Sequence, residues 1–258
     1  MTAALPSGDP YKFTTIAHAD HRYMSPLSAA RAAALVDLFA LARGDRVLDI
    51  GCGRARFLME VLAAHPAVGI GVDANAALIA LGNAAARELR LSARVTLIAK
   101  PLGDAVQGGG DHAAVICMGS SQAVGSFADA LAWAFRALQP GGVALFADGY
   151  WKHPPAADYL DVLGAIADEM GSHAGNAALA RDSGFRVLRT MTSNDDEWDE
   201  YEGLYCSAVE RYVDAHPEDP DGPAMGERIR RWHDAYLRWG RDTLGFGFYF
   251  LLKPARST

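Results

Sequence analysis

Five short apolar runs alternate with helical stretches between residues 45 and 147, and this alternation restricts the folds that the chain can adopt. The stretches between them, such as 54–64 and 76–90, carry apolar residues at helical spacing or are rich in alanine and leucine. Strands that alternate with helices form a parallel sheet whose two faces the helices cover. We therefore predict an α/β fold with a doubly wound sheet. Its first five strands are expected at 45–50, 68–72, 94–98, 113–118 and 143–147.

The chain beyond Tyr150 has a different pattern, in which longer helices interrupt the sheet. Aromatic and charged residues recur at helical spacing in two long stretches, and an apolar, aromatic-rich run closes the chain as a last buried strand. The Pro/Asp-rich segment 216–223 is expected to be an exposed loop. We predict helices over 156–170, 198–216 and 224–241, a sixth strand over 184–191 and a last strand over 245–252.

We interpret the 258 residues as a single domain, because neither an internal repeat nor a low-complexity linker separates its parts. Residues 1–43 form a helical N-terminal cover. Residues 44–150 form the first half of the sheet, and residues 151–258 form a second half with a helical insertion before the last strand. An apolar fraction of 50% with 21% charged residues is sufficient for one continuous core.

The composition excludes several classes of function. Lys and Arg number 24 against 31 Asp and Glu, so the net charge is −7, and no basic block is present to follow a nucleic-acid backbone. No apolar run approaches the roughly 18 residues of a membrane helix, and the first ten residues lack the features of a secretory signal. Three cysteines without CxxC spacing favour a reduced, cytoplasmic protein without a disulfide framework.

The segment that follows the first expected strand is the most informative for function. Gly51 and Gly53 let the backbone approach a ligand at a point where a side chain would collide with it. The next helix presents unpaired N–H groups and the positive end of its dipole to an anionic group. Asp73 stands at the end of the second strand, where its carboxylate can accept hydrogen bonds from ribose hydroxyls. These three residues predict an adenosine-type cofactor site at the carboxyl ends of the strands.

The glycine pattern separates two kinds of cofactor. A dinucleotide fingerprint would place a glycine at position 56, where this chain has Arg56. The pattern here is Asp49-x-Gly51-x-Gly53-x-Ala55, with an acid two residues before the first glycine. It resembles the first motif of the class I S-adenosylmethionine-dependent methyltransferases, and Ala55 replaces the third glycine that is frequent in that family.

The resemblance extends over residues 45–252. Gly71-Val-Asp73 is similar to the second motif of the family, Val115–Gly119 to its fourth strand, and Leu138–Val143 to the entry into its fifth strand. The resemblance implies a Rossmann-like sheet of seven strands with an antiparallel last strand. It also implies S-adenosyl-L-methionine as cofactor and S-adenosyl-L-homocysteine as product, with residues 44–150 as the cofactor-binding half. The residues expected to bind this cofactor are Asp49, Gly51, Cys52, Gly53, Asp73, Ala74, Gly119 and Ser120.

The two ends of the chain resemble a group of bacterial members of this family, through Asp20-His-Arg22, Tyr150-Trp151 and Trp198-Asp-Glu-Tyr-Glu202. The resemblance implies an acceptor site above strands four and five, with residues 151–258 as the substrate-side half. His21 is the candidate base, because the ordinary pKa of histidine lies near neutrality. The expected catalytic residues are His21, Asp148 and Tyr150, and the expected substrate-binding residues are Ser121, Trp151, Trp198 and Tyr201.

Several of these features have a plainer structural interpretation that stays open. The acids between Asp195 and Glu202 are typical of a solvated helix start, where they favour the helix dipole. The acid that many relatives place directly after the third strand is displaced here to Asp104. Three aromatic residues at helical spacing are more typical of a core than of a pocket. These are Trp232, Tyr236 and Trp239.

Together these features predict an enzyme, an S-adenosylmethionine-dependent methyltransferase that acts on a small-molecule acceptor by in-line methyl transfer. An NAD(P)-dependent oxidoreductase and a cofactor-binding module without catalysis remain as alternatives. Residues before about Ala40 mix polar and aromatic side chains and are expected to close over the bound molecules. We expect no metal, no nucleic-acid or membrane partner, and a monomer or a homodimer.

Overall fold

The computed structural model describes residues 8–106 and 109–255, which divide into two compact units. The sheet unit comprises Ser28–Gly149, His173–Thr192 and the chain from Phe246 onward. The helical unit comprises the chain up to Leu27, Tyr150–Ser172 and Ser193–Gly245. Each unit is thus assembled from three separate segments. Residues 1–7, where the predicted N-terminal cover begins, lie outside the described residues.

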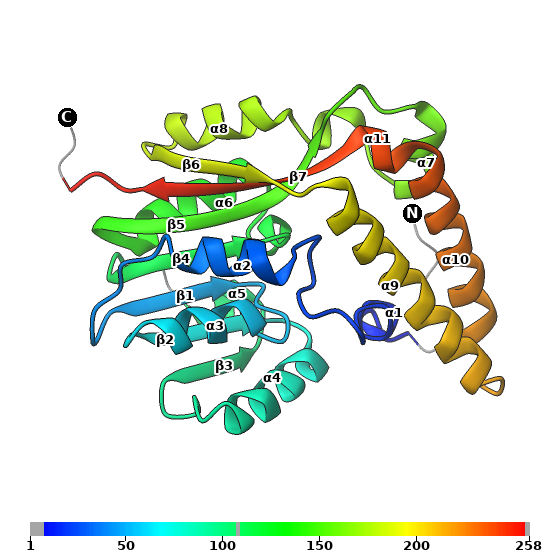
Figure 1. Ribbon diagram of the computed structural model, residues 1–258, viewed down its shortest axis with the longest axis horizontal. Coiled ribbons are helices and arrows are strands. Elements are labelled where there is room, and N and C mark those ends of the chain that lie inside the picture. Colours follow the sequence, from blue (N-terminus) through cyan, green and yellow to red (C-terminus); the bar gives the residue numbers. More distant parts are fainter. Residues whose placement is uncertain (1–7, 107–108, 256–258) are drawn as a thin grey trace. The chain divides into compact units, whose positions relative to one another are not determined.

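The sheet has seven strands in the order β3-β2-β1-β4-β5-β7-β6 (Figure 1). β1 is parallel to both β2 and β4, β4 is parallel to β5, and β6 and β7 are antiparallel. Directly after β7, Lys253 exchanges backbone hydrogen bonds with Gly141 and Gly142 near the start of β5, so these two strands are also antiparallel. The predicted seven-stranded α/β sheet with an antiparallel last strand is confirmed. The strands are β1 (Arg46–Ile50), β2 (Val68–Asp73), β3 (Val95–Ala99), β4 (His112–Met118), β5 (Leu138–Trp151), β6 (Arg186–Thr192) and β7 (Leu244–Leu252).

Helices cover both faces of the sheet, as the alternating pattern predicts. Figure 1 shows α2 and α3 in front of the sheet and α6 behind it. The Asn75 side chain caps α4 by accepting hydrogen bonds from the N–H groups of Ala77 and Leu78, and Ser126 and Asp129 form a capping box at the start of α6. The helices of the sheet unit are α2 (Ala29–Val36), α3 (Arg56–Ala64), α4 (Ala76–Glu88), α5 (Leu102–Ala105), α6 (Phe127–Ala137) and α8 (His173–Asp182), with the short turn η1 (Ser121–Ala123).

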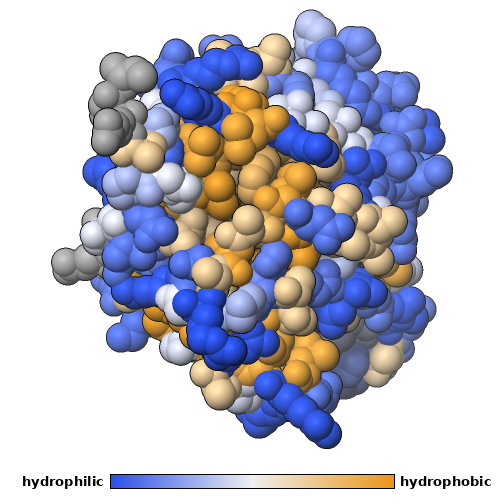
Figure 2. All heavy atoms as spheres, turned by 60° about the vertical axis from the view of Figure 1, so that its left-hand side comes forward, coloured by the Kyte–Doolittle hydropathy of each residue, from blue (hydrophilic) through white to orange (hydrophobic). Residues whose placement is uncertain are grey.

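The core of the sheet unit consists of strand residues that are buried on both faces of the sheet. Val47 and Leu48 of β1 point to opposite faces of the sheet, as do Val115 and Ile116 of β4, and all four are fully buried, which explains why these strands are apolar runs rather than alternating patterns. Some apolar residues remain at the surface, and Figure 2 shows a band of them on one face of the molecule. Among the described residues, no helix is both long and apolar enough to cross a membrane.

The helical unit is built around the long helix α9 (Asp195–Ala215), which packs against α1 (Lys12–Ala17) and α10 (Gly222–Ala235). Asn194 and Glu197 form a capping box at the start of α9. The apolar core between these three helices consists of Phe13, Ala17, Val209, Met225 and Ile229. The other elements of this unit are α7 (Ala157–Leu163), η2 (Ala167–Glu169), the π-helical turn η3 (Tyr236–Gly240) and α11 (Arg241–Thr243).

Two predicted helices are shorter in the structure than in the sequence interpretation. The helix predicted over 156–170 is interrupted, because α7 ends at Gly164, whose φ of +65° lies in the left-handed region that ends helices. The helix predicted over 224–241 changes into a π-helical turn after Ala235. The sequence interpretation also did not include α8.

The helical cover predicted over 1–43 divides between the two units. α2 packs on α3 in the sheet unit, whereas α1 packs on α9 in the helical unit. Phe13 is only 4% exposed, and the Lys12 ammonium donates hydrogen bonds to Asp219 at 2.7 Å and to Asp221 at 2.6 Å. α1 is therefore fastened to the helical unit through Phe13 and Lys12.

We expect Lys12→Met to lower the melting temperature of the protein most strongly at neutral pH. The hydrogen bond from Lys12 lowers the pKa of Asp219 to about 2. The ion pair therefore stabilises the fold above the ordinary carboxyl pKa of about 4 and loses this effect as the pH falls toward 2. The difference in melting temperature between variant and wild type should be largest at pH 7 and should shrink between about pH 4 and about pH 3.

The control for this measurement is Lys100→Met, which removes an exposed lysine and the same formal charge. This variant should melt close to the wild type at every pH. If the melting temperatures of Lys12→Met and the wild type differ by the same amount from neutral to acid pH, the ion pair with Asp219 is not the source of the stability that Lys12 provides.

Candidate active site

The turn after β1 is held in a conformation that favours glycine. Gly51 and Gly53 have φ angles of +63° and +53°, in the left-handed region. A Cβ atom on Gly51 would lie 2.3 Å from the Cβ of Ser120, which follows β4. The Ser120 hydroxyl in turn donates a hydrogen bond of 2.6 Å to the carbonyl of Ile50 at the end of β1. The turn is thus locked against the neighbouring strand, directly before the N-terminus of α3.

Asp73 connects the end of β2 to this glycine turn. One of its carboxylate oxygens accepts a hydrogen bond of 2.8 Å from the N–H of Gly53, and the other accepts one of 2.8 Å from the N–H of Asn75. Each oxygen has a second lone pair, so the carboxylate can still accept hydrogen bonds from a ligand. Its position therefore fits the predicted role toward ribose hydroxyls, and it has a structural role that the sequence did not predict.

Asp49 is the second acid of this region and lies on β1, two residues before Gly51. Its side chain is only 4% exposed. Burial, and to a smaller extent the charge of Asp73, raise the pKa of Asp49 well above its ordinary value. Two neighbouring acids, one of them buried, favour a ligand with a positive group, because a cation relieves both their repulsion and the cost of burial.

Cys52, between the two glycines, packs against the second strand. A Cβ on Gly71 would lie 2.8 Å from the Cys52 sulfur, so the β2 backbone passes close to this thiol. Burial, together with the charges of Asp49 and Asp73, raises the pKa of Cys52 well above its ordinary value. Cys52 is therefore a poor nucleophile, because the thiolate is the reactive form.

The ends of β4 and β5 bring two further predicted residues together. The Ser121 hydroxyl donates a hydrogen bond to the carboxylate of Asp148, which also accepts one of 2.8 Å from the N–H of Gly149. Burial raises the pKa of Asp148, although these two hydrogen bonds act in the opposite direction. Gly119, with a φ of +64°, donates its N–H to the Ala147 carbonyl at 2.7 Å and so turns the chain back over β5.

Ten of the predicted site residues belong to the sheet unit, where they lie in or shortly after β1, β2, β4 and β5. This edge is where the strand order reverses, the position at which open α/β sheets bind ligands. Asp104, the displaced acid, lies on the exposed helix α5 that follows β3. The ten residues are Asp49, Gly51, Cys52, Gly53, Asp73, Ala74, Gly119, Ser120, Ser121 and Asp148.

The helical unit brings His21 and Tyr201 together. The Nε2 of His21 lies 2.9 Å from the Tyr201 carbonyl, and the two rings are 4.8 Å apart at their centroids. Because a carbonyl only accepts hydrogen bonds, Nε2 carries the hydrogen, and a neutral ring has its lone pair on Nδ1. His18 donates from Nδ1 to the Thr14 carbonyl at 2.9 Å and accepts at Nε2 from the Tyr201 hydroxyl at 3.1 Å. The predicted base and a predicted substrate residue are thus neighbours.

The other predicted aromatic residues of the helical unit pack against different partners. Trp151 is buried, and its indole N–H donates a hydrogen bond of 2.9 Å to the Ala167 carbonyl of η2. The ring of Tyr150 lies against the backbone of Gly245, where a Cβ would be 2.2 Å from it. Trp198 stacks on Tyr236 with a centroid distance of 6.3 Å.

The interpretation of the acids on α9 as a solvated helix start is wrong for two of them. Glu197 is 6% exposed and caps the helix, and Glu202 is 3% exposed and accepts a hydrogen bond of 2.9 Å from the indole N–H of Trp232. Asp195 and Asp199 are exposed, as expected. The spacing of the aromatic residues on α9 indicated that one face of this helix is buried. It did not indicate which of the acids lie on that face.

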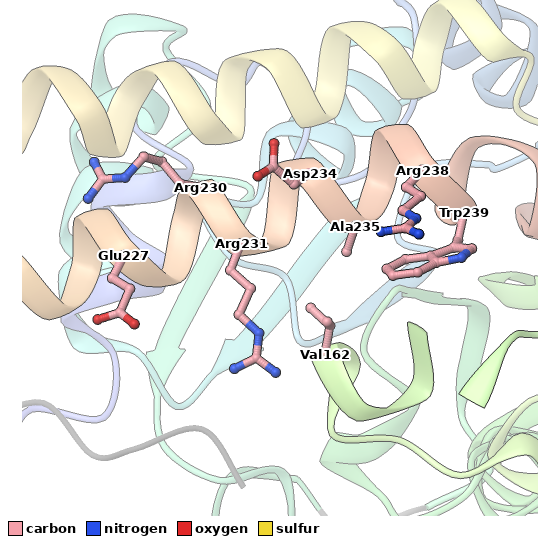
Figure 3. A pocket seen from close by; sticks show the side chains of 8 residues that line it. All are labelled: Val162, Glu227, Arg230, Arg231, Asp234, Ala235, Arg238 and Trp239. Atoms are coloured by element: carbon pink, nitrogen blue, oxygen red, sulfur yellow. The ribbon is translucent and has the colours of Figure 1, made fainter. Parts of the chain in front are cut away.

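A surface groove of about 400 Å³ lies beside α10, and its lining includes Val162 of α7 (Figure 3). Two of its charged groups have partners, since Arg230 pairs with Glu210 at 3.1 Å and the Arg238 guanidinium lies 4.7 Å from the centre of the Trp239 ring. None of the predicted site residues lines this groove. Within the described ranges, no group of three His, Cys, Asp or Glu side chains is placed to hold a metal ion.

Residues 47–142 match the family model described as a methyltransferase domain. This stretch begins in β1 and ends in β5, and it contains the glycine turn, Asp73 and the end of β4.

Proteins of known sequence and structure are similar to the chain over most of its length. The Escherichia coli (strain K12) protein YjhP is 25% identical over 240 residues, which cover 92% of this chain and 96% of YjhP. A SAM-dependent methyltransferase from Geobacter sulfurreducens, solved in complex with S-adenosyl-L-homocysteine, has a TM-score of 0.87 at 25% identity and covers 94% of this chain and 98% of that one. A SAM-dependent methyltransferase from Thiobacillus denitrificans, in complex with the same molecule, has a TM-score of 0.85 at 24% identity, with coverage of 94% and 98%.

The sheet order, the antiparallel last strand and the glycine turn define a class I methyltransferase with a Rossmann-like fold. Residues 47–142 match a methyltransferase domain, and the chain shares the class I fold with SAM-dependent methyltransferases over nearly its whole length. This confirms the resemblance that the glycine pattern indicated.

We expect Gly51→Ala to destabilise the fold and to abolish binding of S-adenosyl-L-homocysteine. The left-handed backbone alone costs about 1–2 kcal/mol for a residue with a Cβ, and the added atom would collide with Ser120. Urea unfolding gives the loss of stability, and titration calorimetry gives the affinity. Gly44→Ala is the matched control, because Gly44 has a φ of +91° but no atom within 4 Å of the position that its Cβ would take. Equal effects of the two substitutions would mean that the close approach to Ser120 is unimportant.

Proposed function

We propose that the protein transfers the methyl group of S-adenosyl-L-methionine to a small-molecule acceptor. The observation that carries this proposal is the Asp73 carboxylate, which lies at the end of β2 and is tied to a glycine turn that a side chain would obstruct. The methyltransferase structures from Geobacter sulfurreducens and Thiobacillus denitrificans contain S-adenosyl-L-homocysteine, the product of this donor.

The residues of the sheet unit fit this donor. Asp73 would accept hydrogen bonds from the ribose hydroxyls, and the backbone of Gly51 and Gly53 would lie against the ligand. Asp49 and Asp73 together would compensate positive charge on the donor, which relieves the burial of Asp49. When bound, the donor supplies an electrophilic methyl group on a sulfonium.

The chain's contribution to such a reaction is mainly orientation. Holding two reactants in line is worth up to roughly 7–11 kcal/mol in well-aligned systems. A group that accepts a proton is needed only if the acceptor must lose one during transfer. We assign this role to Nδ1 of His21, the ring nitrogen that its hydrogen bond to Tyr201 leaves as the proton acceptor. Within the sheet unit, Ser121 and Asp148 are our candidates for contacts with the acceptor. Within the helical unit, considered by itself, the candidates are Tyr150, Trp151, Trp198 and Tyr201.

A small acceptor is supported by charge and by side-chain type. The net charge of −7 is unfavourable for binding to a nucleic-acid backbone. The aromatic rings beside His21 favour a flat or cationic small molecule, through stacking or cation–π attraction. The thiols of Cys52, Cys117 and Cys206 are free, which supports a reducing, cytoplasmic location.

We expect Asp73→Ala to weaken the binding of S-adenosyl-L-homocysteine at least tenfold. Each hydrogen bond to a charged group is worth about 1.5–3 kcal/mol, and about 1.4 kcal/mol corresponds to a factor of ten. Titration calorimetry measures the affinity, and Asp104→Ala is the control, because it removes an exposed acid after the neighbouring strand. An unchanged affinity in Asp73→Ala would place the ribose elsewhere.

We expect the labelled methyl group of S-adenosyl-L-methionine to enter the low-mass fraction of a cell extract when the purified protein is added. Heat-treated protein is the control, and fractionation with scintillation counting is the measurement. Label that appears mainly in protein or nucleic acid would contradict a small-molecule acceptor. Thermal stabilisation by NAD and not by S-adenosyl-L-homocysteine would instead support a dinucleotide enzyme.

A further inference from the structure

A buried acid, Glu202, lies near the middle of α9 among aromatic side chains of the helical unit. Its side chain is 3% exposed. Trp198 lies four residues before it and Tyr205 three residues after it, so both share its helix face. Trp232 reaches it from α10 and donates an indole N–H at 2.9 Å. Two helices therefore place apolar rings around one carboxyl group.

The carboxyl group of Glu202 is held by a hydrogen bond rather than by an ion pair. The indole of Trp232 supplies that hydrogen bond, and among the described residues no Lys, Arg or His forms an ion pair with the carboxyl group. Another buried acid of the same unit does have a cationic partner. Asp221 has no exposed side-chain surface, and it forms an ion pair with Lys12 at 2.6 Å. A buried carboxylate without a cation is costly. Glu202 is therefore a place where a positive ligand would be favourable.

The rings around Glu202 form two contacting pairs. Tyr205 and Trp232 have centroids 6.4 Å apart, and Trp198 stacks on Tyr236 at 6.3 Å. We call these five residues the Glu202 cage: Trp198, Glu202, Tyr205, Trp232 and Tyr236. The faces of aromatic rings attract cations, and an ammonium enclosed by rings and one carboxylate is a common form of cation recognition.

The backbone next to the cage is irregular. α10 changes at Tyr236 into a π-helical turn that ends at Gly240. A Cβ on Gly240 would lie 2.6 Å from the hydroxyl oxygen of Tyr159, so this turn needs a glycine to approach α7. Tyr236 is held by a hydrogen bond of 2.6 Å from its hydroxyl to Asp199. Single π-helical turns occur frequently at functional sites, and this one positions a ring of the cage.

We propose that the Glu202 cage binds an organic ammonium group carried by the methyl acceptor. The inference rests on the proposed function, since it names the substrate class of the same enzyme. The ammonium is a recognition group, and the atom that receives the methyl group need not be the same nitrogen. The carboxylate supplies the negative charge, and Trp198, Tyr205, Trp232 and Tyr236 supply the ring faces.

Choline and its neutral analogue 3,3-dimethylbutan-1-ol test the inference on the full chain. They have the same shape and differ in charge, so the comparison does not depend on a variant that folds. Titration calorimetry at about pH 8 should show choline binding at least tenfold tighter than the alcohol. Binding of both with the same affinity, or of neither, would overturn the inference.

Glu202→Gln is the matching variant, because its amide oxygen can still accept the hydrogen bond of Trp232. Choline affinity should fall at least tenfold in this variant, while the affinity for S-adenosyl-L-homocysteine should be unchanged. Glu210→Gln makes the same change on the same helix at an acid that pairs with Arg230, and it should bind choline as the wild type does. Retained choline binding in Glu202→Gln would also overturn the inference.

The pH dependence of choline binding is a second measurement on the unaltered protein. Burial raises the pKa of Glu202 to about 7, so choline affinity should fall as the pH is lowered through this range, where the carboxylate loses its charge. Glu202→Gln should remove the pH dependence of choline affinity. A pH dependence that remains in this variant would come from the titration of another group. The other titratable or charged groups around the cage are Tyr159, Tyr201, Cys206, Arg228, Asp199 and Arg241, with His18 and His21 beside Tyr205.

The outcomes for the two proposals are distinguishable. If S-adenosyl-L-homocysteine binds and choline does not, the methyltransferase assignment stands and the acceptor is not recognised through an ammonium group at Glu202. If S-adenosyl-L-homocysteine itself does not bind, the proposed function fails, whatever the cage binds.

Discussion

The carboxylate of Asp73 joins the glycine turn after β1 to the start of α4, because each of its oxygens accepts a hydrogen bond from one backbone N–H. One hydrogen bond fixes the glycine turn after β1, and the other fixes the chain that enters α4 through the cap residue Asn75. Ser120 closes the same turn from the end of β4 by its contact with Gly51 and its hydrogen bond to Ile50. Three strand ends are therefore fixed relative to each other before any ligand binds, which lowers the cost of ordering on binding.

The buried acids of this protein are compensated in different ways. In the sheet unit, Asp49 is buried close to Asp73, and both face the edge where a cationic donor is proposed. In the helical unit, Asp221 is neutralised by Lys12, which makes it a structural group that fastens α1. Within the described part of the chain Glu202 has no such cation, although it is also buried. An uncompensated buried acid is stable only if the remaining interactions of the fold offset its cost, and it is ready for a positive ligand.

The sheet half of the fold was predictable because its signals are local. The predicted strands at 45–50 and 68–72 differ from β1 and β2 by a single residue at one end, since the first lies between two glycines and the second begins two residues after Pro66. The glycine turn and Asp73 were predictable for the same reason. Gly164 was a missed signal, because a glycine inside a helical pattern ends the helix only if the chain turns left-handed there. The π-helical turn at Tyr236 had no sequence signal that we recognised.

The sequence by itself determined the α/β alternation, the glycine turn and the resemblance to the methyltransferase family, because these depend on short runs of residues and on backbone geometry. Tertiary structure alone decided which of the acids on α9 are buried, since the burial of Glu202 depends on Trp232, which lies thirty residues further along the chain. It also decided that α1 belongs to the helical unit, because Lys12 finds its partners at Asp219 and Asp221, on the loop that leads into α10. Contacts between residues far apart in sequence depend on how the helices pack, and a local sequence pattern does not predict them.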